Sequence, residues 1–172
     1  MSRAPVLHLV VSAAGPARGI AALVDLLSAD GWTVCLILSP TAATWLDRAA
    51  LAETTGHPVR VEWRFPGDPE PHPRADAVAA VPATFNVMNK WANGINDTLA
   101  LGTLNEAVGA GLPVHAFPCV GRGLGNHPAY AGNRRLLEQA GVVVTDLPNP
   151  DREGWQPVVD ALRPTRVRRS AE

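Results

Sequence analysis

The chain has 172 residues, of which 47% are hydrophobic and 18% are charged. This length and composition suit one α/β domain with a substantial core and leave little room for a second domain. The net charge of -1 and the sequence pI near 6.5 provide no global positive field, so we expect neither nucleic-acid nor membrane-surface partners. No apolar run approaches the roughly 20 residues of a membrane span, and the amino terminus does not resemble a signal peptide. A cytoplasmic location is the resulting expectation.

The first third of the chain predicts two consecutive βα units. Each begins with a run rich in apolar residues, typical of a parallel strand buried on both faces, and continues with apolar residues at helical spacing. The strands are expected at residues 5–11 and 32–38, and the helices at 19–29 and 42–52. Two turns follow the strands, Ser12-Ala13-Ala14-Gly15 and Ser39-Pro40-Thr41. Because open α/β sheets bind ligands at the carboxyl ends of adjacent strands, these turns are candidate phosphate sites.

The middle of the chain begins with an irregular segment and ends with a third βα unit. Residues 59–63 could form a short strand, and the proline-rich residues 66–73 form an excursion loop without regular structure. A buried strand is expected at 76–81, stopped by Pro82, which has no N–H for the sheet. Thr84 and Asn86 follow in a polar loop, before apolar residues at helical spacing through Leu104. A helix that begins there would present free N–H groups to an anion such as phosphate.

The last third predicts two further strands, at 113–118 and 142–144, and helices at 128–140 and 155–162. Strands that alternate with helices favour a single domain with a three-layer α/β/α, Rossmann-like (flavodoxin-like) parallel sheet over residues 1–162. The basic residues 163–172 are expected to be a disordered tail. Cys35 and Cys119 provide neither a disulfide framework nor metal-binding spacing, so no metal site is expected. The glycine patterns of dinucleotide-binding and P-loop proteins are absent from the sequence.

Two motifs resemble those of a known flavoprotein family. Pro82-Ala83-Thr84-Phe85-Asn86-Val87 is similar to the flavin loop Pro-Ala-Ser-Ala-Asn-Thr of the homo-oligomeric flavin-containing cysteine decarboxylases, and residues 90–99 resemble the helix after it. That family includes phosphopantothenoylcysteine decarboxylase and the lanthipeptide decarboxylases. Ser12-Ala13-Ala14-Gly15 and Ser39-Pro40-Thr41-Ala42 match its Thr-Gly-Ser-Ile and Thr-Pro-x-Ala segments. Flavin prenyltransferases have a similar flavin loop, but their additional substrate-binding residues are not found here.

The resemblance implies FMN at the carboxyl ends of the strands, with its phosphate on the first two loops and its ring against the third. It also implies a homotrimer or a dodecamer of trimers, with the face of Trp91, Ile95 and Leu99 partly in an interface. The residues implied to bind the cofactor are Ser12, Ala13, Ala14, Gly15, Ser39, Thr41, Thr84, Phe85, Asn86, Val87 and Cys119.

The chain departs from the family in the substrate-binding region. The family pattern Pro-x-Met-Asn-x-x-Met-Trp-x-His-Pro aligns with residues 118–128, where Gly121 replaces the asparagine that meets the substrate carboxylate. His127 is retained, and we expect it to cap a helix. The family's catalytic histidine stands eight residues before the equivalent of Asp76, whereas His72 stands only four residues before it. His72 is nevertheless the candidate general base, since imidazole titrates near neutral pH.

Three functions follow from these observations. The first is a flavin-dependent enzyme, an oxidoreductase or decarboxylase (lyase), that uses FMN to oxidise a small or peptide substrate such as a thiol-bearing carboxylate. The second is a non-catalytic flavin-binding or regulatory protein with a decayed substrate clamp. The third is a true decarboxylase in which a reshaped loop brings His72 to the substrate. Turnover of the bound flavin would separate the enzymes from the binding protein.

Overall fold

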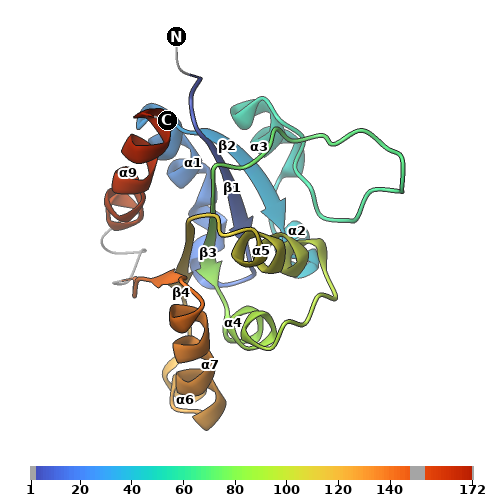
Figure 1. Cartoon of the computed structure of the whole chain (residues 1–172). Coiled ribbons are helices and arrows are strands. Elements are labelled where there is room, and N and C mark those ends of the chain that lie inside the picture. Colours follow the sequence, from blue (N-terminus) through green and yellow to red (C-terminus); the bar gives the residue numbers. More distant parts are fainter. Residues whose placement is uncertain (1–2, 148–153, 172) are drawn as a thin grey trace.

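A parallel sheet forms the centre of the molecule in the computed structural model, which describes residues 3–147 and 154–171 (Figure 1). Within these residues the strand order is β2-β1-β3-β4-β5, and each adjacent pair is parallel. The chain therefore crosses over between strands and reverses its direction of growth after β2. The strands are β1 (Val6–Val11), β2 (Thr33–Leu38), β3 (Ala77–Ala83), β4 (Val114–Pro118) and β5 (Val143–Val144).

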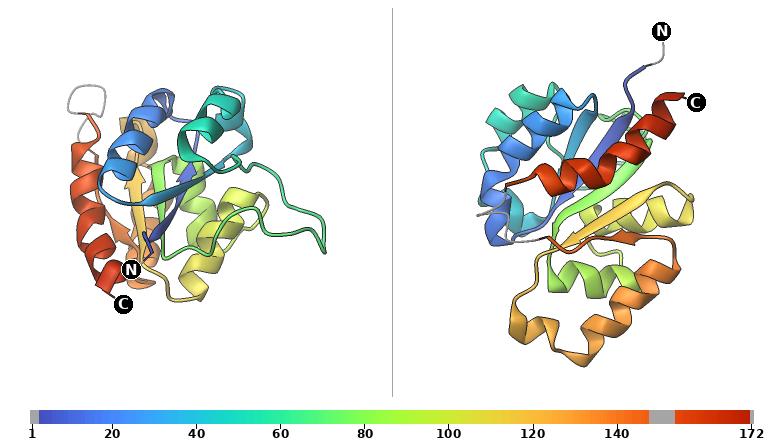
Figure 2. Two further views of the ribbon diagram at one scale, coloured as in Figure 1. Left: turned by 90° about the horizontal axis from the view of Figure 1, so that it is seen from above. Right: turned by 90° about the vertical axis from the view of Figure 1, so that its left-hand side faces the viewer.

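Helices cover both faces of this sheet, as the sequence predicts. One apolar cluster joins α1, α3 and α9 to the face of β1 that carries Leu7 and Leu9; a second joins α4, α5 and α7 to the face that carries Val10. Figure 2 shows these two layers on opposite sides of the strands. The helical segments are η1 (Gly15–Gly19), α1 (Ile20–Ala29), α2 (Pro40–Ala43), α3 (Arg48–Thr55), α4 (Phe85–Ala92), α5 (Leu99–Gly109), α6 (Arg122–Gly125), α7 (Pro128–Gln139) and α9 (Gln156–Ala171). The three-layer α/β/α prediction is confirmed.

Several predicted boundaries are wrong for local reasons. The helix expected at 42–52 is divided into α2 and α3, because Asp47 starts a new helix by accepting a hydrogen bond from Ala50 N. β3 does not stop at Pro82 but continues to Ala83, with a register shift against β4 between Ala80 and Ala83. The strand suggested at 59–63 is reduced to one bridge between Arg60 and Ile37.

The basic carboxyl-terminal segment is helical, which corrects the prediction of a disordered tail. α9 continues through Pro164 to Ala171 and lies against α1 and the sheet. Arg163 and Arg166 both bind the carboxylate of Asp30, at the end of α1, with N···O distances of 2.9 and 3.0 Å. Thr165 is buried and its hydroxyl is 3.0 Å from Nε2 of His115 on β4. The arginines therefore attach this helix to the domain instead of extending into solvent.

None of the helices within residues 3–147 and 154–171 has both the length and the apolar character that crossing a membrane would require.

The buried His115 predicts a loss of stability in mild acid. Burial, with a smaller effect of Arg168, lowers the pKa of His115 from 6.5 to about 4. His115 therefore gains a proton near pH 6.5 in the unfolded chain but only near pH 4 in the native chain. Its contribution to stability is fully present above pH 6.5 and is lost as the pH falls toward 4. Between pH 7 and 5 we expect His115 to remove about 2 kcal/mol from the free energy of unfolding.

Urea unfolding of the wild type and of His115→Asn at pH 7 and pH 5 measures this effect. The free energy of unfolding of the variant should depend less on pH, because the variant lacks the imidazole of His115 and keeps every other ionisable group of the wild type. An equal pH dependence in both proteins would contradict the buried, neutral state of His115.

Candidate functional site

A pocket of about 570 Å³ lies at the carboxyl ends of β1, β2, β3 and β4. It is lined by the turn after each of these strands and by the segment that joins α4 to α5. The volume falls within the range of about 300–1,000 Å³ that is usual for small-molecule and cofactor sites. The lining residues are Ser12, Ala13, Ala14, Ser39, Pro40, Thr41, Thr84, Phe85, Asn86, Val87, Lys90, Asp97, Thr98, Ala100, Leu101, Cys119, Val120, Gly121 and Leu124.

The pocket contains every residue that the sequence assigned to cofactor binding except Gly15. That residue begins η1 and does not line the pocket. The others come together because four parallel strands end at the same edge of the sheet. Their turns are also joined by backbone hydrogen bonds, from Ser39 N to Val11 O at 2.9 Å and from Cys119 N to Ala83 O at 2.9 Å. The four turns thus form one continuous wall.

Ser12 connects the ends of β1 and β3 at the base of the pocket. Its buried hydroxyl donates to Pro82 O at 2.6 Å and accepts from Thr84 N at 3.1 Å, while its own N–H reaches Pro82 O at 3.2 Å. The hydroxyl proton is therefore used within the protein. Ser12 positions Thr84 and is not free to donate to a ligand.

Two other hydroxyls combine helix capping with access to the pocket. Ser39 Oγ accepts from Ala42 N at 3.2 Å, and Thr84 Oγ1 accepts from Val87 N at 3.3 Å. In each case the hydroxyl acts as acceptor, so its proton remains available to a ligand. Thr84 also starts α4, whose first N–H groups and positive dipole end face the same space. This end of the pocket suits a phosphate.

Helices α4 and α5 and the segment between them supply wall residues that the sequence did not identify. Lys90, from α4, forms an ion pair with Asp97 at 2.5 Å, and Ala100 and Leu101 add an apolar surface from α5. The similarity of residues 90–99 to the family helix was the available signal, but it did not distinguish lining residues from packing residues. The pair supplies both a positive and a negative side chain to the wall.

The residues at the changed substrate clamp form the outer part of the pocket. Gly121 and Leu124 line it, and Gly121 is the N-cap of the short helix α6. His127 caps α7, as predicted, by accepting a hydrogen bond from Ala129 N at 3.1 Å. Its ring also packs edge-on against Phe85, with 5.7 Å between centroids. His127 therefore supports a wall residue of the pocket without lining the pocket itself.

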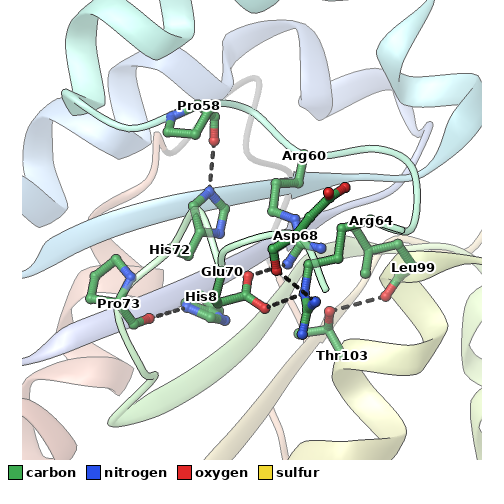
Figure 3. Close-up of polar contacts among 10 residues, drawn as sticks. All are labelled: His8, Pro58, Arg60, Arg64, Asp68, Glu70, His72, Pro73, Leu99 and Thr103. Atoms are coloured by element: carbon green, nitrogen blue, oxygen red, sulfur yellow. Dashed lines mark hydrogen bonds and ion pairs between the residues drawn. The ribbon is translucent and has the colours of Figure 1, made fainter. Parts of the chain in front are cut away.

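His72 does not line this pocket, so the structure gives no support to its predicted role as the base. His72 is only 3% exposed: it is part of the excursion loop, and its ring points inward, with Nε2 donating a hydrogen bond to Pro58 O at 2.6 Å (Figure 3). Burial lowers its pKa, and the hydrogen bond to Pro58 opposes that effect more weakly. Its place in a proline-rich loop gives no sign of this burial, which results from the packing of the segment against β1 and β2.

The face suggested for oligomer contact is largely internal. Trp91 and Leu99 are 3% and 5% exposed within a single chain, whereas Ile95 is 43% exposed. Of the three side chains, only Ile95 therefore remains available to a partner. The homotrimer or dodecamer of trimers stays a prediction.

Residues 1–164 match the family described as Flavoprotein. The chain belongs to the Flavoprotein family. This match covers the whole of the sheet and the pocket, and it accounts for the similarity of the flavin loop. No curated protein matches the chain.

Solved structures of similar fold include named flavin enzymes. The FMN-dependent cysteine decarboxylase TvaF from thioviridamide biosynthesis is 24% identical, with a TM-score of 0.76 and coverage of 98% of this chain and 99% of that chain. The corresponding enzyme SpaF is 18% identical, with a TM-score of 0.77 and coverage of 96% and 97%. HAL3 from Cryptococcus neoformans is 20% identical, with a TM-score of 0.79 and coverage of 96% and 98%. At these identities the likeness establishes the shared fold.

The pocket has the features that FMN requires. Ala13 and Ala14 are small enough to let a phosphate approach the first turn, and the hydroxyls of Ser39 and Thr84 can donate to it. Phe85, Val87 and other apolar side chains supply a surface for a flat ring. The residues present therefore fit the cofactor.

The bridging role of Ser12 predicts a cost both to folding and to binding. Ser12→Ala would leave the part-buried N–H of Thr84 without its acceptor and remove the hydroxyl bond to Pro82 O, so the free energy of unfolding should fall by about 1–3 kcal/mol. Because Thr84 is then no longer held in place, FMN affinity should also decrease. Urea unfolding without FMN and a fluorescence titration with FMN measure the two effects. A variant as stable as the wild type would show that the hydroxyl bridge contributes nothing.

Proposed function

We propose that this protein binds FMN non-covalently in the pocket at the strand ends and acts as a flavin-dependent, decarboxylase-like oxidoreductase. The principal support is that the predicted cofactor residues, other than Gly15, line one pocket of suitable size. Membership of the Flavoprotein family and the fold shared with FMN-dependent cysteine decarboxylases support the same cofactor. The substrate class that we propose is a small or peptide carboxylate with an oxidisable group such as a thiol.

The protein's contribution would be position and electrostatics. The hydroxyls of Ser39 and Thr84 and the first turn of α4 would hold the phosphate, and Phe85 and Val87 would contact the ring. When bound, FMN supplies the capacity to accept a hydride from the substrate. Leu124 and the apolar residues of α5 would limit the access of water to the reacting atoms.

The polar groups near the substrate differ from those of a cysteine decarboxylase. Gly121 offers no side chain to a carboxylate, so the anchor would be a backbone N–H or another charged group of the pocket wall. Among the described lining residues, Lys90 and Asp97 carry the full charges. Lys90 is the better partner for a substrate carboxylate, because it is cationic and only partly exposed. Lys90 would thus take the carboxylate-anchoring role that Gly121 cannot fill.

A negative charge added to the pocket wall tests cofactor binding. Asn86→Asp places a carboxylate at the pocket wall and removes an amide donor, so the affinity for FMN should fall by about tenfold or more through repulsion of the dianionic phosphate. Asn93→Asp adds the same charge at the end of α4, outside the pocket lining, and serves as the control. Fluorescence titration measures both. Equal affinities for the two variants would contradict the assignment of Asn86.

Flavin reduction separates an enzyme from a binding protein. Under anaerobic conditions, a peptide ending in cysteine should bleach the visible absorption of the FMN-bound protein, whereas the same peptide ending in serine should not. The difference is expected because a cysteine thiol ionises far more readily than a serine hydroxyl: the thiol proton would pass to solvent, the hydride of the adjacent C–H bond would pass to FMN, and a C=S bond would form in the peptide. An unchanged flavin spectrum with cysteine peptides and free thiol carboxylates would favour the non-catalytic, flavin-binding function.

A further inference from the structure

Three side chains with metal-binding atoms meet on the sheet outside the flavin pocket. His8 of β1 and Cys35 of β2 are register partners on adjacent parallel strands, so their side chains project from the same face. His72, from the segment between α3 and β3, covers them; its ring centroid is 5.4 Å from that of His8. One ligand atom from each residue lies within 4.8 Å of those of the other two. Figure 3 shows the two imidazoles side by side under this segment.

The hydrogen bonds of the two imidazoles fix which nitrogen can bind a cation. Nε2 of His8 is 2.9 Å from Pro73 O, and Nε2 of His72 is 2.6 Å from Pro58 O. A carbonyl oxygen only accepts, so each Nε2 carries the proton and each neutral ring has its lone pair on Nδ1. This arrangement is typical of metal-binding histidines, whose second nitrogen commonly donates to a backbone carbonyl.

The Nδ1 atom of His72 is buried and has no hydrogen-bond partner. A buried acceptor without a donor costs free energy, which a cation at that position would recover. His115 also has a buried Nδ1 without a partner, but it faces no described cluster of ligand residues. The unpartnered nitrogen of His72 differs because a thiol and a second imidazole lie beside it.

The protonation states agree with this geometry. Burial lowers the pKa values of His8 and His72, so both rings are neutral at pH 7 and able to act as ligands. Burial also raises the pKa of the Cys35 thiol to about 11, so this group is protonated while no cation is bound. Arg60 also lowers both histidine pKa values, and its guanidinium is paired with Glu70.

We propose that His8, Cys35 and His72 form a binding site for one Zn²⁺ ion, through Nδ1 of each imidazole and the thiolate of Cys35. Two imidazoles and one thiolate are ligands that Zn²⁺ accepts in tetrahedral sites. Bond lengths of about 2.0–2.1 Å to nitrogen and 2.3 Å to sulfur place ligand atoms about 3.3–3.7 Å apart. One ligand atom from each residue lies within 4.8 Å of the other two, so the widest separation would need to contract by about 1–1.5 Å on binding.

Binding involves one bond exchange and no redox step. Zn²⁺ binds to Cys35 Sγ, the S–H bond breaks, and the proton passes to solvent. Three protein ligands leave the fourth tetrahedral position to water or to an added ligand. His8 also lines a separate cavity of about 380 Å³ together with Arg60 and Glu70. A bound ion would attach the segment of His72 to β1 and β2.

Metal titration of untagged, chelator-treated protein tests the site directly. Calorimetry with ZnCl₂ in two buffers of different ionisation enthalpy should give one ion bound per chain and about one proton released. Co²⁺ in place of Zn²⁺ should give a thiolate-to-metal charge-transfer band in the near ultraviolet. Both wild-type measurements are independent of whether any variant folds.

Matched variants connect the signal to the three residues. Cys35→Ser should abolish the charge-transfer band, and His72→Asn should lower Zn²⁺ affinity by at least the ~100-fold that loss of an outer-shell partner can cost. Cys119→Ser and His115→Asn alter a thiol and a buried imidazole elsewhere and should bind Zn²⁺ as the wild type does. FMN affinity should be unchanged in Cys35→Ser and His72→Asn, which distinguishes this site from the flavin pocket.

Two results would overturn the proposal. One is wild-type protein with Co²⁺ and no charge-transfer band; the other is Cys35→Ser that binds Zn²⁺ with wild-type stoichiometry and affinity. Loss of FMN binding in every protein, with the metal signal intact, would count against the proposed flavin function alone.

Discussion

The hydrogen bonds that join the strand ends determine the shape of the pocket at the carboxyl edge of the sheet. Ser12 links β1 to β3, Ser39 N links β2 to β1, and Cys119 N links β4 to β3. Each bond satisfies a backbone group at the point where a strand gives way to a turn, which would otherwise be left unpaired. The four turns are consequently fixed relative to one another before any ligand arrives. A binding site assembled in advance loses less conformational entropy when the ligand binds.

The same constraint explains how residues distant in the sequence act together. Thr84 accepts the N–H of Val87 and is itself held by Ser12, so the start of α4 depends on the end of β1. The positive end of α4 and the hydroxyl of Ser39 then face one space. Although neither element alone would make a phosphate site, their arrangement on a rigid sheet edge provides donors from two directions.

The sequence was sufficient to predict the sheet and most of this pocket. Runs such as Val6–Val11 are apolar throughout, which is typical of parallel strands covered on both faces, and the order of strands and helices then restricts the topology. The flavin-loop motif identified Thr84 and Asn86. The Lys90–Asp97 pair was missed because helical periodicity shows which residues are polar but not which of them face a cavity.

Two other features depend on tertiary contacts that leave no local pattern. Residues 163–171 resemble a solvated basic tail in the sequence. In the structure they are helical, and Arg166 and Thr165 contact Asp30 and His115 of distant elements. His72 resembles an exposed loop residue between prolines, yet the packing of its segment over Cys35 buries it. Its ligand partners come from separate strands, so the usual short spacing of metal-binding motifs could not reveal them.

The central claim is that the pocket at the strand ends holds FMN, and the visible spectrum of the purified protein tests it most directly. We expect flavin absorption bands, either on purification or after incubation with FMN and gel filtration, at about one flavin per chain. Mass spectrometry of the flavin released by heat denaturation should identify it as FMN and not as riboflavin or FAD. A protein that remains colourless after incubation with saturating FMN would contradict the account.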